Sequence, residues 1–291
     1  MKPVLLAAAF AAAFAIPPAW GTTGDITALE VTRKVNIAGR QRMLSQRMAK
    51  ASCMIAAGVD EGTHYDQLTQ AYDLFVRSDD ALRYGNADMG LGPEQRRAVM
   101  RALERIDTPW AGYSRIVEGV IEEGSIERGE VALVSEASVE VLRLMNMAVN
   151  QTARSYGDSL PDVPLALTIT IDVAGRQRML SQRAMKELCL LHVTGDAATY
   201  GPMLESTMNV FDLSLTALQE GFADVGVMAA PNEEIAAQLA HVRELWTPIF
   251  AEFSEAVAEG SVDFEELSLL AQTSDVLLRE MNTAVGMYEL D

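Results

Sequence analysis

The sequence predicts an all-α protein, built as two tandem antiparallel four-helix bundles that pair as a pseudo-two-fold dimer through their first helices. Three observations support this fold class. Residue types that favour helices are abundant, and few stretches show the alternation typical of a strand. The segment AGRQRMLSQR occurs twice, at residues 38–47 and 174–183. Short connections between amphipathic segments are typical of antiparallel bundles.

The repeat extends far beyond this segment, because other residues recur at the same offset of 136. Ten identical residues could arise by convergence, but matches spread over a whole unit indicate duplication. The further matches are Cys53 with Cys189, Trp110 with Trp246, Glu123-Gly124-Ser125 with Glu259-Gly260-Ser261, and Met145-Asn146 with Met281-Asn282. We therefore expect a first unit over 22–156, a linker over 157–164 and a second unit over 165–291.

Each unit is expected to contain four helices. Gly58, Gly85 and Gly124 end the helical patterns of the first unit, and Pro109 should kink or interrupt the third helix. Ser125 is a suitable cap for the fourth helix. The predicted helices of the first unit are 25–57, 65–84, 94–123 and 125–155. The second unit should repeat this scheme from about residue 165 to residue 288.

The first 21 residues resemble a secretory signal peptide. Lys2 gives a minimal positive start, an apolar run follows, and Ala19 and Gly21 are the small residues that precede a cleavage site. An uncleaved N-terminal anchor is the alternative, although the apolar run is short for a membrane span. Both interpretations predict a periplasmic or secreted protein, where a disulfide can persist.

The composition argues against several functional classes. The formal net charge is −18, which disfavours nucleic acid as a partner. The three histidines, His64, His192 and His241, are isolated, so no metal site is expected, and methionines at helical spacing are typical of a core. No nucleophile elbow, phosphate-binding loop or dinucleotide motif is present. We therefore expect neither a cofactor nor an enzymatic activity.

The first helix of each unit carries two stripes of residues. One stripe is apolar and should face the core of its own bundle. The opposite stripe mixes small and polar residues, which on most helices would be solvated. The apolar stripe consists of Ile37, Leu44, Met48, Ala51 and Ile55, and the opposite one of Gly39, Arg42, Gln46, Ala49 and Cys53. The second copy of the opposite stripe contains Gly175, Arg178, Gln182 and Cys189.

Three features indicate that the opposite stripe is an interface. A glycine within a helix costs about 1 kcal/mol relative to alanine, so Gly39 suggests a close approach of another segment. Cys53 is unusual on an exposed exported surface. The same stripe also occurs on the second helix, so the two helices can pair about a pseudo-two-fold axis. Arg42 would then face Arg178.

The helical period links the arginines to the cysteines. Arg42 and Cys53 are eleven residues apart, which brings them to within about 20° of each other around the helix. If the arginines meet, Cys53 should therefore meet Cys189, and we expect a disulfide between them. Two buried free thiols are the alternative.

Two facing guanidinium groups repel each other and need a compensating partner. A small planar oxyanion can bridge them through charge-assisted hydrogen bonds. In the alternative, each arginine pairs with a nearby carboxylate or extends to solvent. Arg40 and Arg47 lie on a different flank of the helix, where structural ion pairs within the bundle are expected.

At these residues the sequence resembles the NarX/PilJ-type N-terminal domains of nitrate/nitrite sensor kinases, nitrate chemoreceptors and type IV pilus chemotaxis transducers. The matching segments are 36–47 and 172–183, and the pieces 145–149 and 281–285 resemble the fourth helix of the family. The resemblance implies periplasmic four-helix bundles that dimerise through their first helices. In nitrate-binding members an arginine and backbone groups from each protomer hold one anion at the dimer interface.

The resemblance assigns the anion-binding role to Arg42 and Arg178. We expect Gly39, Gly175, Gln46, Gln182 and Asn36 beside them, with Asp172 in place of the second Asn36. The implied function is a periplasmic binding or sensor protein for nitrate or nitrite, with a membrane-bound sensor kinase or chemoreceptor as partner and a single chain forming the internal pseudo-dimer. The alternative is a non-catalytic adaptor for a chemotaxis or pilus receptor, with no small ligand.

Overall fold

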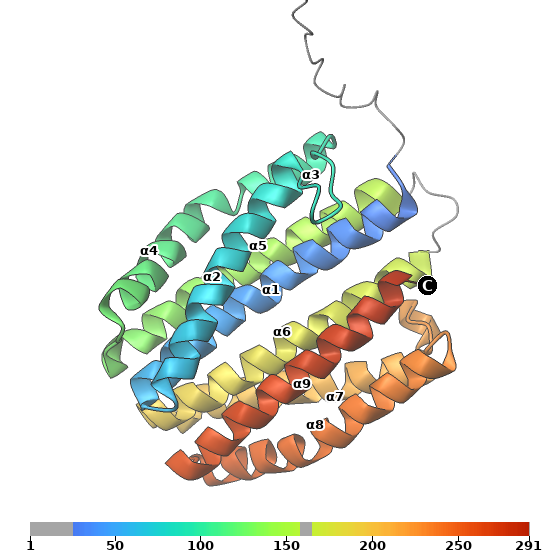
Figure 1. Cartoon of the computed structure of the whole chain (residues 1–291). Helices are drawn as coiled ribbons and strands as arrows, with labels where there is room; N and C mark the ends of the chain where they lie inside the picture. Colours follow the sequence, from blue (N-terminus) through green and yellow to red (C-terminus); the bar gives the residue numbers. More distant parts are fainter. Residues whose placement is uncertain (1–25, 158–164, 291) are drawn as a thin grey trace, which may run out of the picture.

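The computed structural model describes residues 26–157 and 165–290. Within these ranges the regular elements are helices, and the two isolated β-bridges lie in turns. Figure 1 shows two groups of long helices, one running from blue to green and one from yellow to red, packed side by side. The predicted all-α fold class is therefore confirmed. The expected signal peptide and nearly all of the expected linker lie outside the described residues.

The first group contains five α-helices and one short 3₁₀ helix. Two long helices are followed by two shorter ones and a final long helix that returns along the first. The elements are α1 (Ala28–Ala57), α2 (Glu61–Tyr84), α3 (Arg97–Glu104), α4 (Asp107–Glu123), η1 (Arg128–Glu130) and α5 (Val131–Gly157).

The second group repeats this arrangement with an uninterrupted third helix. Helix α6 packs against α7 and α9, as α1 packs against α2 and α5. The elements are α6 (Leu165–Thr194), α7 (Ala197–Glu220), η2 (Ala223–Val225), α8 (Glu233–Glu259) and α9 (Phe264–Leu290).

The ends of α1 follow from local chemistry. The Thr27 side chain accepts a hydrogen bond from the backbone N–H of Glu30 at 3.1 Å, which satisfies a donor that the first helical turn leaves open. Gly58 follows the last turn at φ 79°, a left-handed conformation that glycine adopts without steric cost. The predicted end of the first helix at Gly58 is thus confirmed.

Two sequence expectations for the first unit, the start of the second helix and the cap of the fourth, are wrong in detail. Helix α2 begins earlier than residue 65, because Asp60 caps it through the backbone N–H of Thr63. The interruption expected from Pro109 is confirmed, because the third helix is divided into α3 and α4; in a continuous helix the ring of Pro109 would clash with the carbonyl of Arg105. Ser125 is not a cap, because η1 intervenes before α5.

Helix α1 is buried on almost every side, so neither of its two stripes is solvated. Met48 and Leu44 face the helices of their own bundle, while Arg42 and Cys53 lie toward α6. The contact between α1 and α6 is the most extensive between any two elements of the molecule. The residues of the mixed stripe therefore form the interface between the two bundles.

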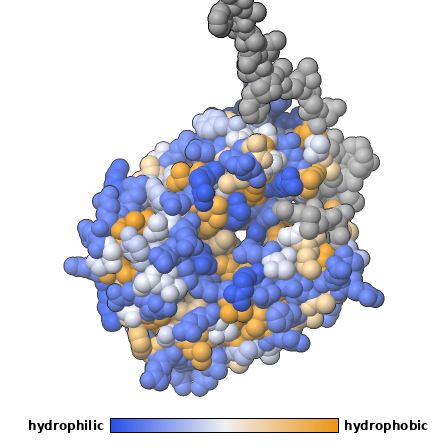
Figure 2. Space-filling model, viewed as in Figure 1, coloured by the Kyte–Doolittle hydropathy of each residue, from blue (hydrophilic) through white to orange (hydrophobic). Residues whose placement is uncertain are grey.

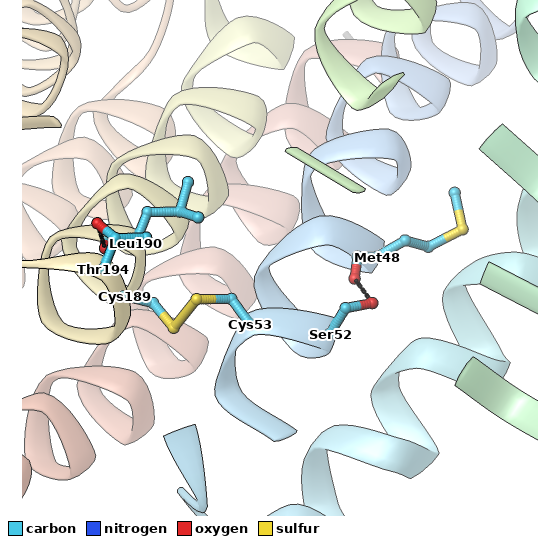
Figure 3. The surroundings of a disulfide bond; sticks show 6 residues. All are labelled: Met48, Ser52, Cys53, Cys189, Leu190 and Thr194. Carbon is cyan, nitrogen blue, oxygen red and sulfur yellow. Dashed lines mark hydrogen bonds between the residues drawn. A yellow bond between two sulfur atoms is a disulfide. The ribbon is translucent and has the colours of Figure 1, made fainter. Parts of the chain in front are cut away.

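A disulfide crosses this interface. Cys53 of α1 and Cys189 of α6 are bonded, with their Cα atoms 6.2 Å apart. Figure 3 shows the bond between the two helices, while Met48 and Ser52 lie on the other side of α1. The structure thus contains the pairing expected from the helical period, and free thiols are not found among the described residues.

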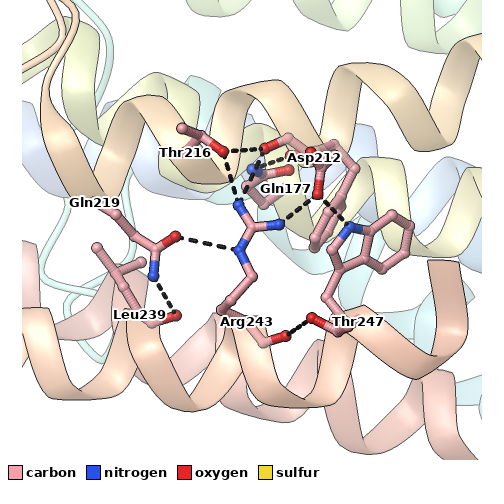
Figure 4. A network of polar contacts seen from close by, with 9 residues as sticks. Gln177, Asp212, Thr216, Gln219, Leu239, Arg243 and Thr247 are labelled. Atoms are coloured by element: carbon pink, nitrogen blue, oxygen red, sulfur yellow. Dashed lines mark hydrogen bonds and ion pairs between the residues drawn. The ribbon is translucent and has the colours of Figure 1, made fainter.

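Polar contacts also hold the helices within each bundle. In the second bundle Arg243 of α8 pairs with Asp212 of α7, and the same carboxylate accepts a hydrogen bond from the Trp246 indole N–H at 3.1 Å (Figure 4). Figure 2 shows a mainly hydrophilic outer face with scattered hydrophobic residues, hollowed where the two bundles meet. The molecule's large apolar groups are thus mostly inside, and its ion pairs fix the helices around them.

We expect the disulfide to stabilise the pairing of the bundles, because it closes a sequence separation of 136 residues. The double variant Cys53→Ser/Cys189→Ser should lose roughly 2–4 kcal/mol of unfolding free energy, measured by denaturant titration. Thiol titration of the oxidised wild-type protein should detect no free thiol.

A reductant provides the control for this prediction. It should lower the Tm of the wild-type protein and leave that of the double serine variant unchanged. Equal stability of the oxidised wild type and the double variant would contradict the expected role of the bond.

Candidate ligand site between the repeats

The guanidinium groups of Arg42 and Arg178 meet over two glycines. A Cβ atom on Gly39 would lie 3.1 Å from Nη2 of Arg42 and 3.8 Å from Nη2 of Arg178. A Cβ atom on Gly175 would lie 3.3 Å from Nη2 of Arg178 and 3.8 Å from Nη2 of Arg42. Glycine at both positions therefore leaves the room that the two arginines occupy, and both guanidinium groups are buried.

Each arginine has an asparagine partner in its own bundle, and these two asparagines are related by the offset of 136. Nη1 of Arg42 donates to Oδ1 of Asn146 at 3.1 Å, and Nη1 of Arg178 donates to Oδ1 of Asn282 at 3.4 Å. These asparagines belong to the last long helix of the arginine's own bundle. The repeated Met-Asn pieces contain them, but the helical period does not reveal which residues of another helix face the arginines.

The second partner of each arginine comes from the opposite repeat. Nη2 of Arg178 donates to Oδ1 of Asn36 at 2.5 Å, and Nη2 of Arg42 donates to Oδ1 of Asp172 at 2.7 Å. Asn36 and Asp172 occupy equivalent positions in the two repeats. The site is therefore symmetric in geometry and asymmetric in charge, with an amide on one side and a carboxylate on the other.

Asp172 is shared by two arginines. Its second oxygen accepts a hydrogen bond from Nη2 of Arg176 at 2.9 Å. Burial alone would raise the pKa of Asp172, but the attraction of Arg42 and Arg176 is stronger and the pKa is lowered. Burial in turn lowers the pKa of Arg42, against the opposing attraction of Asp172. Asp172 is thus a carboxylate at neutral pH and partly balances the cationic centre.

The glutamines expected at the site lie one helical turn further along the interface. Nε2 of Gln46 donates to the backbone oxygen of Ser138 at 3.2 Å, and its Oε1 accepts from Nζ of Lys186 at 2.9 Å. Oε1 of Gln182 accepts from Nη1 of Arg47 at 3.5 Å. The repeated AGRQRMLSQR motif thus contributes to two adjacent polar layers, one around the arginines and one around the glutamines.

The repeats also match a known family. The model of the family described as type IV pili methyl-accepting chemotaxis transducer N-term (PilJ) matches residues 27–134 and again residues 168–271, which together make up most of the chain. The chain belongs to this family. A search of curated proteins found no match.

Each PilJ-type segment contains one arginine of the pair and its glycine, Arg42 with Gly39 in the first and Arg178 with Gly175 in the second. The family comprises sensor domains of chemotaxis transducers, so the chain is a tandem pair of sensor-type domains. In the described residues no helix is long and apolar enough to span a membrane. Nor do His, Cys, Asp and Glu side chains in the described ranges form a group suited to hold a metal ion.

A second buried cationic layer lies between the PilJ-type arginine centre and the disulfide. It contains Lys50 and Lys186, which are equivalent in the two repeats and fully buried. Lys50 pairs with Asp275 of α9 at 2.8 Å, and Arg47 reaches the same carboxylate at 3.4 Å. Arg47 therefore forms an ion pair as expected, but with a residue of the other repeat rather than of its own bundle.

Burial sets the protonation of both lysines. It lowers the pKa of Lys50 to about 8, against the attraction of Asp275. It also lowers the pKa of Lys186 to about 8, against the attraction of Glu187. Neither lysine was assigned a role from the sequence, although both continue the stripe at four residues beyond the glutamines. This spacing is the signal that could have identified them, although lysine is rarely buried.

From the lowered pKa values of Lys50 and Lys186 we predict how the unfolding free energy changes with pH. Their pKa values are about 8 in the fold and 10.5 in the unfolded chain, so the unfolded chain binds more protons between these values. The unfolding free energy contributed by these groups should therefore rise from pH 8 to pH 10. Lys186→Met should reduce that rise, measured by urea titration at several pH values.

Arg143→Met is a suitable control, because Arg143 is exposed and keeps its charge over this range. It should retain the wild-type dependence on pH. Parallel curves for the wild type and Lys186→Met would show that Lys186 keeps an ordinary pKa in the fold.

Proposed function

We propose that this chain is a periplasmic sensor module that binds one small oxyanion, nitrate or nitrite, between its two PilJ-type repeats. The observation that carries the proposal is the convergence of the Nη2 atoms of Arg42 and Arg178 over Gly39 and Gly175. Two planar guanidinium groups that converge in this way suit a planar anion that accepts hydrogen bonds from both. The resemblance of the repeated motif to nitrate-sensing domains supports the same ligand.

Asp172 determines how such an anion would bind. Its carboxylate is planar and donates no hydrogen bond, so it imitates an oxyanion that is covalently attached to the chain. It contacts Arg42 at 2.7 Å, where a free anion would have to compete with it. The Asn36 side carries no such charge and contacts Arg178. The anion should therefore bind closer to Arg178, with an affinity reduced by repulsion from Asp172.

A membrane partner would recognise the state of the protein with the anion bound. The anion would bridge α1 and α6, so its binding changes the balance of charge at the contact between the bundles. A sensor kinase or chemoreceptor in the membrane could then recognise the altered pairing of the repeats. This role agrees with the family, whose named members are transducer domains.

Isothermal titration with nitrate and with nitrite tests the proposal. The wild-type protein should bind weakly, and Asp172→Asn should bind at least about tenfold more tightly, because it makes the second half-site equal to the first. Asn36→Asp should abolish binding, since it places a carboxylate on each side. These two substitutions exchange the same two side chains and are matched in size.

The arginines provide the second comparison. The paired substitution Arg42→Gln/Asp172→Asn removes both members of the ion pair and avoids an unpaired buried charge. It should remove the gain in affinity seen with Asp172→Asn alone. Absence of measurable heat with either anion for both the wild type and Asp172→Asn would refute anion binding at this site.

An adaptor for a chemotaxis or pilus receptor, without a small ligand, is the second candidate. The contacts of Arg42 with Asn146 and Asp172 favour it, because these partners stabilise the guanidinium within the chain. In this case a membrane receptor should co-purify equally with the wild type and with Arg42→Gln/Asp172→Asn. Loss of the receptor on adding nitrate to the wild type would instead support the sensor.

A further inference from the structure

A cavity of about 760 Å³ lies on one side of the interface between the repeats. Helix α5 of the first repeat forms one wall, and α6, α7 and the turn at 221–227 form the others. Most of its surface is apolar, and its apolar lining includes Val149, Ile169, Val173, Leu213, Phe222 and Val225. Its volume falls within the range of about 300–1,000 Å³ that is typical of small-molecule sites.

The apolar character of this cavity is specific to the second repeat. Ile169 and Leu213 occupy the positions of Arg33 and Arg77 in the first repeat, and Phe222 occupies the position of Asn86. The turns are equivalent, because the isolated bridges Asn86–Leu91 and Phe222–Val227 form at the same offset. The two repeats began as identical sequences. The charged and polar residues of the first repeat and the apolar residues of the second therefore arose by later divergence at the same place in the fold.

The same contact shows the difference directly. In the first repeat the Arg33 guanidinium lies against Gly90 of the turn, and in the second repeat Cδ1 of Ile169 lies 3.0 Å from the position of a Cβ on Gly226. A charged head group is thus replaced by a methyl group under the turn. Leu213, Phe222 and Val225 are nevertheless exposed, so the change was not needed to fill the core.

The polar end of the cavity carries a donor that lacks a partner. Arg176 and Asp172 both line the cavity, and Nη2 of Arg176 donates to Oδ2 of Asp172 at 2.9 Å. Nε of Arg176 is buried and meets no hydrogen-bond acceptor among the described residues. The Arg176 side chain is 41% exposed, so its guanidinium group can also pair with a carboxylate or carbonyl oxygen of a ligand in the cavity.

We propose that this cavity is a second ligand site, which binds a small amphiphile with an apolar chain or ring and one carboxylate or carbonyl group. The apolar body lies between α5 and α7, against Val149, Ile169 and Leu213. The acceptor oxygen pairs with the guanidinium group of Arg176, whose side chain is partly exposed and lines the cavity. This site is separate from the proposed anion site at Arg42 and Arg178, which involves the other oxygen of Asp172.

Calorimetric titration with decanoate, and with decanol and decyltrimethylammonium as neutral and cationic probes of equal chain length, tests the proposal. The wild-type protein should bind decanoate most tightly and the cation most weakly. Arg176→Gln should bring decanoate and decanol to similar affinity. A structural role of Arg176 alone would change both affinities together and leave their ratio unchanged.

The first repeat supplies the variants that close the cavity. Ile169→Arg and Leu213→Arg insert the residues of the equivalent positions and should each weaken decanoate binding at least about tenfold. Leu269→Arg is the matched control, because Leu269 is an equally exposed leucine of α9 that does not line the cavity. It should bind like the wild type, and thermal melting of each variant checks that it is folded.

Three results would overturn the proposal. The first is no binding of decanoate or decanol to the wild type. The second is binding that Ile169→Arg and Leu213→Arg leave unchanged. The third is a wild-type dimer, seen by light scattering, that Leu213→Arg dissociates while no probe binds, which would identify a second copy of the chain as the occupant of this surface.

Discussion

The pairing of α1 with α6 brings positively charged side chains together in the interior of the molecule. The other polar contacts of the interface compensate these buried charges. Arg42 lies beside Arg178, and one layer further along Lys50 and Lys186 are fully buried. Buried charges are costly unless they are paired. Carboxylates, asparagines and glutamines therefore surround them, and the disulfide fixes the two helices beyond the second layer.

The compensation comes unequally from the two repeats. Three carboxylates lie near these cations, Asp172, Glu187 and Asp275, and all belong to the second repeat. The first repeat has Asn36, Ala51 and Val139 at the equivalent positions. Two copies of the first repeat paired in the same way would lack these charges. Fusion in one chain therefore lets one half carry the compensating acids that a symmetric dimer would have to carry twice.

Asp172 connects the two sites proposed for the chain. One of its oxygens contacts Arg42 at the centre of the interface, and the other contacts Arg176 beside the apolar cavity. A change in the partner of either arginine alters the electrostatic field at the other through this single carboxylate. The sequence marked Asp172 as a departure from the repeat. Its contact with Arg176 is an i,i+4 pair on α6, whereas its contact with Arg42 of α1 depends on the packing of the two repeats.

The sequence by itself determined the duplication, the helical class and the stripe that joins the repeats, since the helical period places Arg42 and Cys53 on one face. It did not determine the asparagines Asn146 and Asn282 beside the arginines, or the buried lysines. Those depend on which side chains of other helices reach the interface. Periodicity fixes the direction of a side chain on its own helix, whereas tertiary packing decides which partner stands opposite it.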